Sequence, residues 1–260
     1  MIREFRQLFK REELKISITA CFIIAVVGFL SSLPMARSMF ASELPSAAHG
    51  AMIFNNQMGQ AFSAFLLPLI CSFCYADSYY MERKSGYWIA VRSRLSKSAY
   101  MWKKAIVVTI SSFFIAMLPF LINQLLCFAF FPLTSTYDMF ASTKGTVNFP
   151  NLYENMPYLN NMVYILLNGI YGGVLGLLAF AFSLYIKKSR VVTLVATTIF
   201  MILSYFLVGL PSKESYVVYN YLYSAPLHFY VEIYKFFVII AVLLIISLVG
   251  ICLKLRKDEI

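Results

Sequence analysis

Charged residues are scarce in this sequence. Of its 260 residues only 13% are charged, whereas 60% are hydrophobic, and the mean hydropathy is +0.74. A soluble domain has about 25% charged and about 45–50% apolar residues. A chain of this length with so little polar surface cannot cover its apolar side chains in water. The composition therefore excludes a soluble enzyme and a disordered chain.

The residue patterns of common active sites are also missing. The sequence has only two histidines, His49 and His228, and no G-x-x-x-x-G-K-[ST], H-E-x-x-H or G-x-S-x-G motif. We therefore expect no catalytic residue, no metal site and no cofactor bound by this chain. We also expect that the chain is not an enzyme by itself. The apolar runs hold no carboxylates for proton- or sodium-coupled transport, so any transport would draw its energy from another subunit.

Disulfide chemistry is not indicated either. The five cysteines lie inside apolar runs or at their ends: Cys21, Cys71, Cys74, Cys127 and Cys252. Cys71 and Cys74 have the spacing of a redox or metal pair, but no histidine or second cysteine pair accompanies them. Buried packing of free thiols is the favoured interpretation.

Long apolar runs are what the sequence does contain. A helix needs about 20 mostly apolar residues to cross a bilayer. Six runs qualify or nearly so: residues 16–33, 58–75, 105–131, 162–186, 191–210 and 236–253. The runs are continuous rather than alternating, which predicts helices and not a barrel. We predict an all-α integral membrane protein with six transmembrane helices, forming a single transmembrane domain over residues 1–260.

The basic residues predict the orientation of these spans. Of the 22 Lys and Arg residues, all but four precede the first span, follow the last one, or lie in the second and fourth connections. The four exceptions are Arg37, Lys144, Lys213 and Lys235. The positive-inside rule then predicts a multi-pass protein of the cell membrane with both termini in the cytoplasm. The net charge of +10 is concentrated on that side, so it indicates topology and a docking surface rather than nucleic acid.

The first fifteen residues predict an amphipathic helix lying in the membrane interface. Ile2, Phe5 and Phe9 recur at helical spacing, while the basic residues fall largely elsewhere. An ordinary basic tail that only sets topology is the alternative.

The connection over residues 77–104 is the most informative stretch. Trp88, Val91 and Leu95 share one apolar helical face. The basic residues Arg92, Arg94 and Lys97 lie largely off that face. The pattern predicts a short amphipathic helix that presents cations to a cytoplasmic partner, and a loop that merely sets topology is the alternative.

Polar and small residues inside the spans form two further groups. The polar group comprises Asn123, Gln124 and Asn168, which could line a substrate path or hydrogen-bond between helices. The small group comprises Gly169, Gly172, Gly173 and Gly176, two overlapping small-xxx-small pairs that favour close helix packing. The external segment 211–235 is rich in tyrosine, which indicates a re-entrant helical segment in the outer interface before the last span.

These features resemble the membrane subunits of ATP-binding-cassette exporters of the type-2 permease class. Members have an interfacial helix, six spans, a cytoplasmic coupling helix between spans two and three, and a re-entrant helical pair before the last span. The resemblance covers the full chain. Its sharpest local match is Glu82, Gly86, an apolar helix, a basic turn and then Lys104. The aromatic pair Tyr87-Trp88 departs from the small polar residues of many relatives.

The resemblance implies a half-transporter. A second permease subunit, identical or paralogous, would complete the pathway in the lipid bilayer, and cytoplasmic ATP-binding-cassette ATPase subunits would bind ATP and Mg. The coupling loop that contacts them would hold Glu82, Gly86, Trp88, Arg92, Arg94 and Lys97. The substrate implied first is an amphipathic or antimicrobial peptide, for export or bacteriocin immunity, and drug or lipid export is the alternative. A non-transporting sensor or assembly module and an intramembrane enzyme are the readings outside this class.

Overall fold

The computed structural model describes most of the chain as a helical bundle. The described residues are 2–39, 45–59, 61–86, 96–135, 148–186, 189–208, 217–224 and 232–257. Every regular element within those ranges is a helix. The predicted all-helical class is therefore confirmed for the described part of the chain.

Five described helices are long and apolar enough to cross a membrane, and a sixth span is added if one bent helix pair is counted as a single span. The five are α2 (Glu12–Met39), α7 (Lys97–Phe130), α9 (Pro157–Tyr185), α10 (Arg190–Val208) and α11 (Ile233–Lys257). All five begin before the apolar runs that predicted them. The difference is largest in α7, where the side chain of Ser96 caps the helix by accepting a hydrogen bond from the Ala99 amide, eight residues or so before the apolar run.

The second predicted span, 58–75, is helical over Phe62–Ala76, but the helix there is irregular, and a sixth span stays a prediction. Six short elements lie in and around this run: α3 (Ala47–Phe54), η1 (Asn55–Gly59), η2 (Phe62–Leu66), α4 (Leu67–Cys71), η3 (Ser72–Ala76) and α5 (Ser78–Lys84). Three of them, the η elements, are π-helical. Pro68 near the start of α4 has no N–H for the helical ladder. The bent pair meets at Asp77, where the helix axis turns by 42°.

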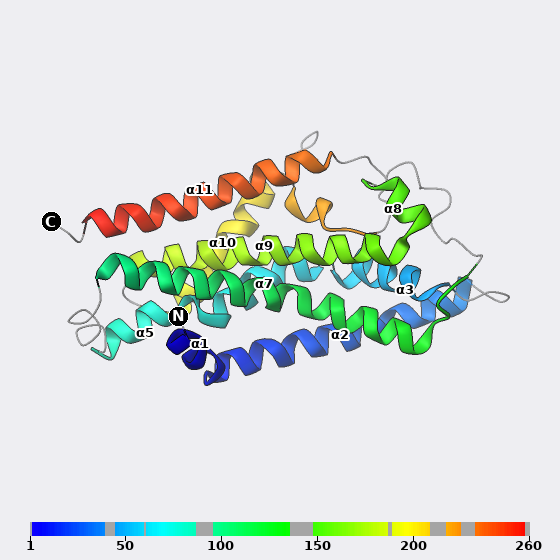
Figure 1. Ribbon diagram of the computed structural model, residues 1–260, viewed down its shortest axis with the longest axis horizontal. Coiled ribbons are helices and arrows are strands. Elements are labelled where there is room, and N and C mark those ends of the chain that lie inside the picture. The colour runs from blue at the N-terminus through cyan, green and yellow to red at the C-terminus, as the bar shows by residue number, and fades with distance from the viewer. Residues whose placement is uncertain are drawn as a thin grey trace.

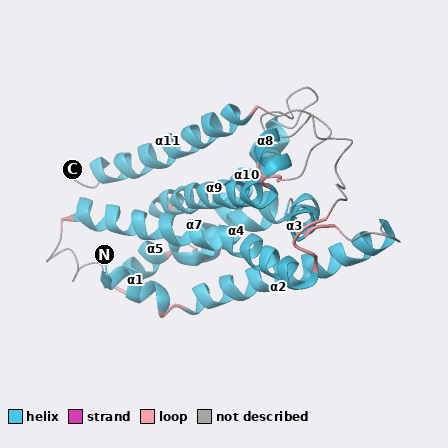
Figure 2. Ribbon diagram, turned by 45° about the vertical axis from the view of Figure 1, so that its right-hand side comes forward, coloured by secondary structure: helices cyan, strands magenta, loops and turns pink. Residues whose placement is uncertain are grey.

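The helices form a bundle around α9 (Figures 1 and 2). Of the most apolar window of α9, 83% is buried, against 22% in α10 and 28% in α11. We call the end that holds α1 (Ile2–Phe9), α5 and the last turns of α11 the inner end. The opposite end, which holds α3 and α8 (Pro150–Asn155), is the outer end.

The predicted glycine stripe of α9 lies against α7. A Cβ added to Gly172 would stand 2.2 Å from Cβ of Ala116, and one added to Gly176 would stand 2.2 Å from Oγ of Ser112. Gly169 and Gly173 face α7 in the same way, next to Met117 and Thr109 respectively. Hydrogen at these positions lets the two backbones approach more closely than any side chain would allow.

The N-terminal helix α1 turns part of its apolar side toward the bundle. Leu8 is buried and Phe5 packs against the core, whereas Phe9 is 68% exposed. The exposed Phe9 is available to the membrane interface, and the interfacial placement of α1 stays a prediction. The polar side of α1 is turned toward the bundle, because Glu4 bonds to groups of the second span and α7 described below.

Candidate functional site

Charged side chains from widely separated segments meet at the inner end. We call this group the inner ionic cluster. Its members are Glu4, Arg11, Glu13, Asp77, Glu82, Lys104 and Arg190. They belong to the regions of α1, α2, α5, α7 and α10, so the cluster joins five helices.

Asp77 is the centre of one half of the cluster. Its side chain is fully buried at the bend before α5. Arg11 donates to Oδ1 at 2.6 Å, and Nε of Arg190 donates to Oδ2 at 2.7 Å. Arg190 also donates to Glu13 on α2. A buried carboxylate is tolerated here because both of its oxygens receive charge-assisted hydrogen bonds.

Lys104 is the centre of the other half. Its side chain is also fully buried, 2.8 Å from Glu82 and 3.5 Å from Glu4. The hydroxyl of Tyr100 donates a hydrogen bond to Glu82 as well. One buried ammonium therefore holds carboxylates from α1 and α5 against α7.

The ring of Tyr75 joins the two halves. The guanidinium of Arg11 lies 4.9 Å from its centroid and the ammonium of Lys104 lies 5.0 Å from it. The Tyr75 hydroxyl donates to Glu4 at 3.0 Å. The quadrupole of an aromatic ring attracts cations that lie over its face, so the Tyr75 ring stabilises both Arg11 and Lys104.

The cluster closes the base of the predicted coupling loop. Glu82, the first residue of that loop, lies in α5, and Lys104 lies in α7, after the end of the loop. Gly86 follows the end of α5 with a φ of 73°, a backbone conformation that glycine adopts without strain. Lys97 is the first residue of α7, and its role in the coupling loop stays a prediction. Trp88, Arg92 and Arg94 lie outside the described residues.

The sequence did not identify most of this cluster. Arg11, Lys104 and Arg190 were counted with a basic surface that faces the cytoplasm, yet each is paired inside the protein. The one usable signal was Asp77, a carboxylate placed directly after an apolar run.

The predicted pathway residues occupy separate places in the bundle. Asn168 accepts from Ser63 at 2.9 Å and donates to the carbonyls of Tyr164 and Leu222. Its amide thus bonds across helices, and a role in a substrate path stays a prediction.

Gln124 and Asn123 are adjacent in α7 but face different neighbours. Gln124 donates to the Ala47 carbonyl at 3.3 Å and accepts from Asn161 at 2.9 Å. Asn123 accepts only a weak bond from the thiol of Cys127, and its buried Nδ2 has no hydrogen-bond partner among the described residues. The structure therefore does not bring the three amides together at one point.

Asparagines from two elements also hold the chain between α10 and α11. Its described part, residues 217–224, contains the short 3-10 helix η6 (Val218–Tyr221). Asn55 of η1 donates to the Leu222 carbonyl and to the Ser224 hydroxyl, and Asn160 of α9 donates to the Ser224 carbonyl. With Asn168 they form what we call the outer amide clamp. Leu222 and Ser224 are buried, so this polar backbone is satisfied inside the bundle.

The remainder of the predicted re-entrant segment 211–235 lies largely outside the described residues, and a helical pair is not confirmed. Within the part of the chain that the structure describes, no group of three or more His, Cys, Asp or Glu side chains is placed to hold a metal ion. All five cysteines are free, and Cys71 and Cys74 are buried.

A scan against protein-family models found no match to this chain, and neither curated proteins nor solved structures gave a match.

Proposed function

We propose that this chain is the membrane subunit of an ATP-driven exporter, working as a dimer and driven by a separate cytoplasmic ATPase. Six spans, an inner end in the cytoplasm and the coupling loop over residues 82–97 belong to this proposal. The observation that carries it is the inner ionic cluster, because the cluster ties both stems of that loop to three other helices.

The arrangement supports a mechanical role for the loop. An ATPase that pushes on the loop displaces α5 and the start of α7 together, since Glu82 and Lys104 are paired at 2.8 Å. Asp77 at the bend then carries the displacement to α10 through Arg190. Breaking a buried ion pair by separating its partners costs several kcal/mol, so the cluster favours one arrangement until an external force acts. Alternating access requires an element that can adopt two distinct arrangements, one with these ion pairs formed and one with them separated.

An amphipathic peptide is the substrate that we propose first. The connections between the predicted spans are too short to fold into a domain that captures a polar solute, which supports entry from the cytoplasm or the inner leaflet. Export of a drug or lipid is the alternative. Peptide-stimulated ATP hydrolysis by the reconstituted complex supports the peptide, and stimulation by lipids or drugs alone contradicts it.

Charge reversal tests the docking assignment. We expect Arg92→Glu together with Arg94→Glu to abolish co-purification of a phosphate-loop ATPase and substrate-stimulated ATP hydrolysis. Lys15→Glu is the matched control, because Lys15 is an exposed cation on α2 whose only described ion pair is with the exposed Glu12. Unchanged co-purification and turnover in the double variant would show that the loop is not the docking element. Recruitment of an ATPase without substrate movement in vesicles would favour a sensor or assembly module instead.

A further inference from the structure

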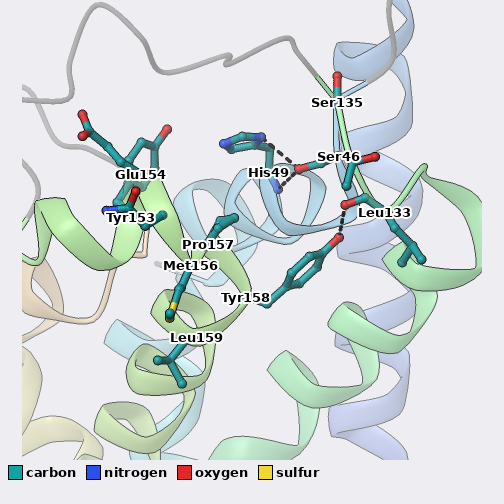
Figure 3. A pocket seen from close by; sticks show the side chains of 12 residues that line it. Ser46, His49, Leu133, Ser135, Tyr153, Glu154, Met156, Pro157, Tyr158 and Leu159 are labelled. Atoms are coloured by element: carbon teal, nitrogen blue, oxygen red, sulfur yellow. Dashed lines mark hydrogen bonds between the residues drawn. The ribbon is translucent and has the colours of Figure 1, made fainter.

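A pocket of about 610 Å³ opens at the outer end, at the opposite end of the bundle from the inner ionic cluster. It lies where the start of α3, residues 133–135, α8 and the start of α9 meet (Figure 3). Glu154, Met156 and Leu159 on its rim are exposed, so a ligand can enter. The volume is that of a site for a small molecule or one large side chain.

The deep wall of the pocket is built from ordered polar and aromatic groups. The Nδ1 atom of His49 lies 3.0 Å from the Ser46 hydroxyl, and the His49 ring is 6.0 Å from the buried ring of Tyr153. Tyr158 donates to the Leu133 carbonyl at 2.5 Å and stacks on Phe128 with the ring centroids 5.2 Å apart. These contacts fix the two tyrosine rings before any ligand arrives, which reduces the entropy lost on binding.

The charged side chain among the described lining residues is that of Glu154. It forms no ion pair or hydrogen bond with another described residue. None of the described lining residues is a lysine or arginine. Figure 3 shows Glu154 and Tyr153 on one side of the pocket, His49 in the middle and Leu133 on the other side.

We propose that this pocket binds an organic cation, an ammonium or guanidinium group carried on an apolar body. Glu154 supplies the opposite charge, and the tyrosine rings supply faces on which a cation is stabilised. Met156 and Leu159 give apolar contact for the attached body. The ligand chemistry has two sources, a free hydrophobic amine or a basic side chain of a peptide. The proposal does not depend on the exporter proposal, because it concerns the isolated chain and needs no ATPase.

Direct binding to the full chain in nanodiscs of zwitterionic lipid tests the proposal. The two cationic probes are phenethylammonium and a labelled 12-residue peptide of leucine and lysine. Their neutral counterparts are 2-phenylethanol and the same peptide with glutamine in place of lysine. We expect the cationic probes to bind about tenfold more tightly than the neutral ones at low salt, with the difference reduced at high salt.

Single substitutions then locate the site. Glu154→Gln is expected to weaken the cationic probes about three- to fivefold, as for loss of one exposed charge pair. Glu232→Gln is the matched control, since that exposed carboxylate is already paired with Lys235 at 2.8 Å. Tyr158→Leu is expected to weaken binding by a similar factor, whereas Tyr158→Phe keeps the ring and nearly all of the affinity.

The binding results distinguish the two sources of the cation and show whether the pocket binds a cation at all. Binding of the amine alone identifies a free amine as the ligand, and binding of the peptide alone identifies a basic side chain. Equal affinity for cationic and neutral probes, no binding of either cation, or the same affinity in the Glu154→Gln and Glu232→Gln variants would overturn the proposal. Unchanged thermal unfolding of the Glu154→Gln variant shows that the fold is intact, as expected for an exposed side chain.

Discussion

Replacing Asp77 by asparagine tests how strongly the inner ionic cluster holds the helices together. The change keeps the size of the side chain and removes its charge, leaving Arg11 and Arg190 without their shared carboxylate. A buried pair that loses one partner costs about 3–5 kcal/mol. The Arg11 and Arg190 side chains are 18% and 34% exposed, so water recovers part of that cost. We expect a loss of about 2–3 kcal/mol in the free energy of unfolding.

The chain carries its own reporters for this measurement. Cys21, Cys71, Cys74 and Cys127 are buried, and Cys252 is exposed. A maleimide dye that becomes fluorescent on reaction therefore gives a small initial signal from one thiol and a large one when the bundle unfolds. A loss of about 2–3 kcal/mol corresponds to a fall of roughly 4–10 °C in Tm for a domain of this size.

The matched control is Glu12→Gln on the same end of the bundle. Glu12 pairs with Lys15 at 2.8 Å, but the two side chains are 75% and 63% exposed, so its loss is expected to shift Tm by no more than about 1 °C. The single variant Arg190→Gln and the double variant Asp77→Asn/Arg190→Gln complete a double-mutant cycle. The double variant should lose less free energy of unfolding than the sum of the two single losses. Equal Tm values for Asp77→Asn and Glu12→Gln, or strictly additive losses, would refute the stabilising role.

Two further predictions concern the packing and the outer end. Gly172→Ala places a methyl group 2.2 Å from the Cβ of Ala116, so we expect the free energy of unfolding to fall by about 1–3 kcal/mol, measured by the same dye assay. Gly250→Ala is the control, because its added methyl group meets only an ordinary contact at 3.5 Å and should leave Tm unchanged within the error. Equal stability of the two variants would show that the α7–α9 approach is not tight. Leu222→Cys should resist an impermeant maleimide in the wild-type background and react faster when Asn55→Ala removes two of the bonds to this segment. The same rate in both backgrounds would contradict the clamp.

The sequence predicted the helices well and their ends poorly. Apolar runs of the right length mark the spans because lipid demands continuous internal hydrogen bonding. The ends of those runs are not the ends of the helices. α7 extends back to Lys97 because Ser96 caps its first turn and Lys104 pairs with carboxylates inside the protein instead of with water.

The inner ionic cluster could not be read from the sequence, since its pairs are remote along the chain. Arg11 and Asp77 are 66 residues apart, and Arg190 is 113 residues from Asp77 and 177 from Glu13. No local periodicity records such distances. A basic residue near a span is normally a topology signal, and only the fold distinguishes the exposed Lys15 from the buried Lys104.

The predicted polar residues show the same limit. Gln124 and Asn168 stand out in the sequence because amides are rare inside apolar runs. Three further asparagines lie just before the predicted starts of spans, where an amide is not unusual: Asn55, Asn160 and Asn161. Their partners are mostly backbone carbonyls, such as those of Leu222 and Ser224. A carbonyl is present at every residue, so no side-chain pattern could reveal the contact.

The outer amide clamp also has a consequence for how the protein is made. Asn168 enters the membrane with α9, but its partner Leu222 is synthesised 54 residues later. At about 5–20 residues per second, Asn168 spends roughly 3–10 s without that bond. During that interval the Nδ2 of Asn168 can donate to the Tyr164 carbonyl of its own helix, and its Oδ1 can accept from Ser63, which precedes it in the chain. Of the three bonds of the Asn168 side chain, the one to Leu222 is therefore the last that can form as the chain is made, and it closes the outer amide clamp over elements that are already present.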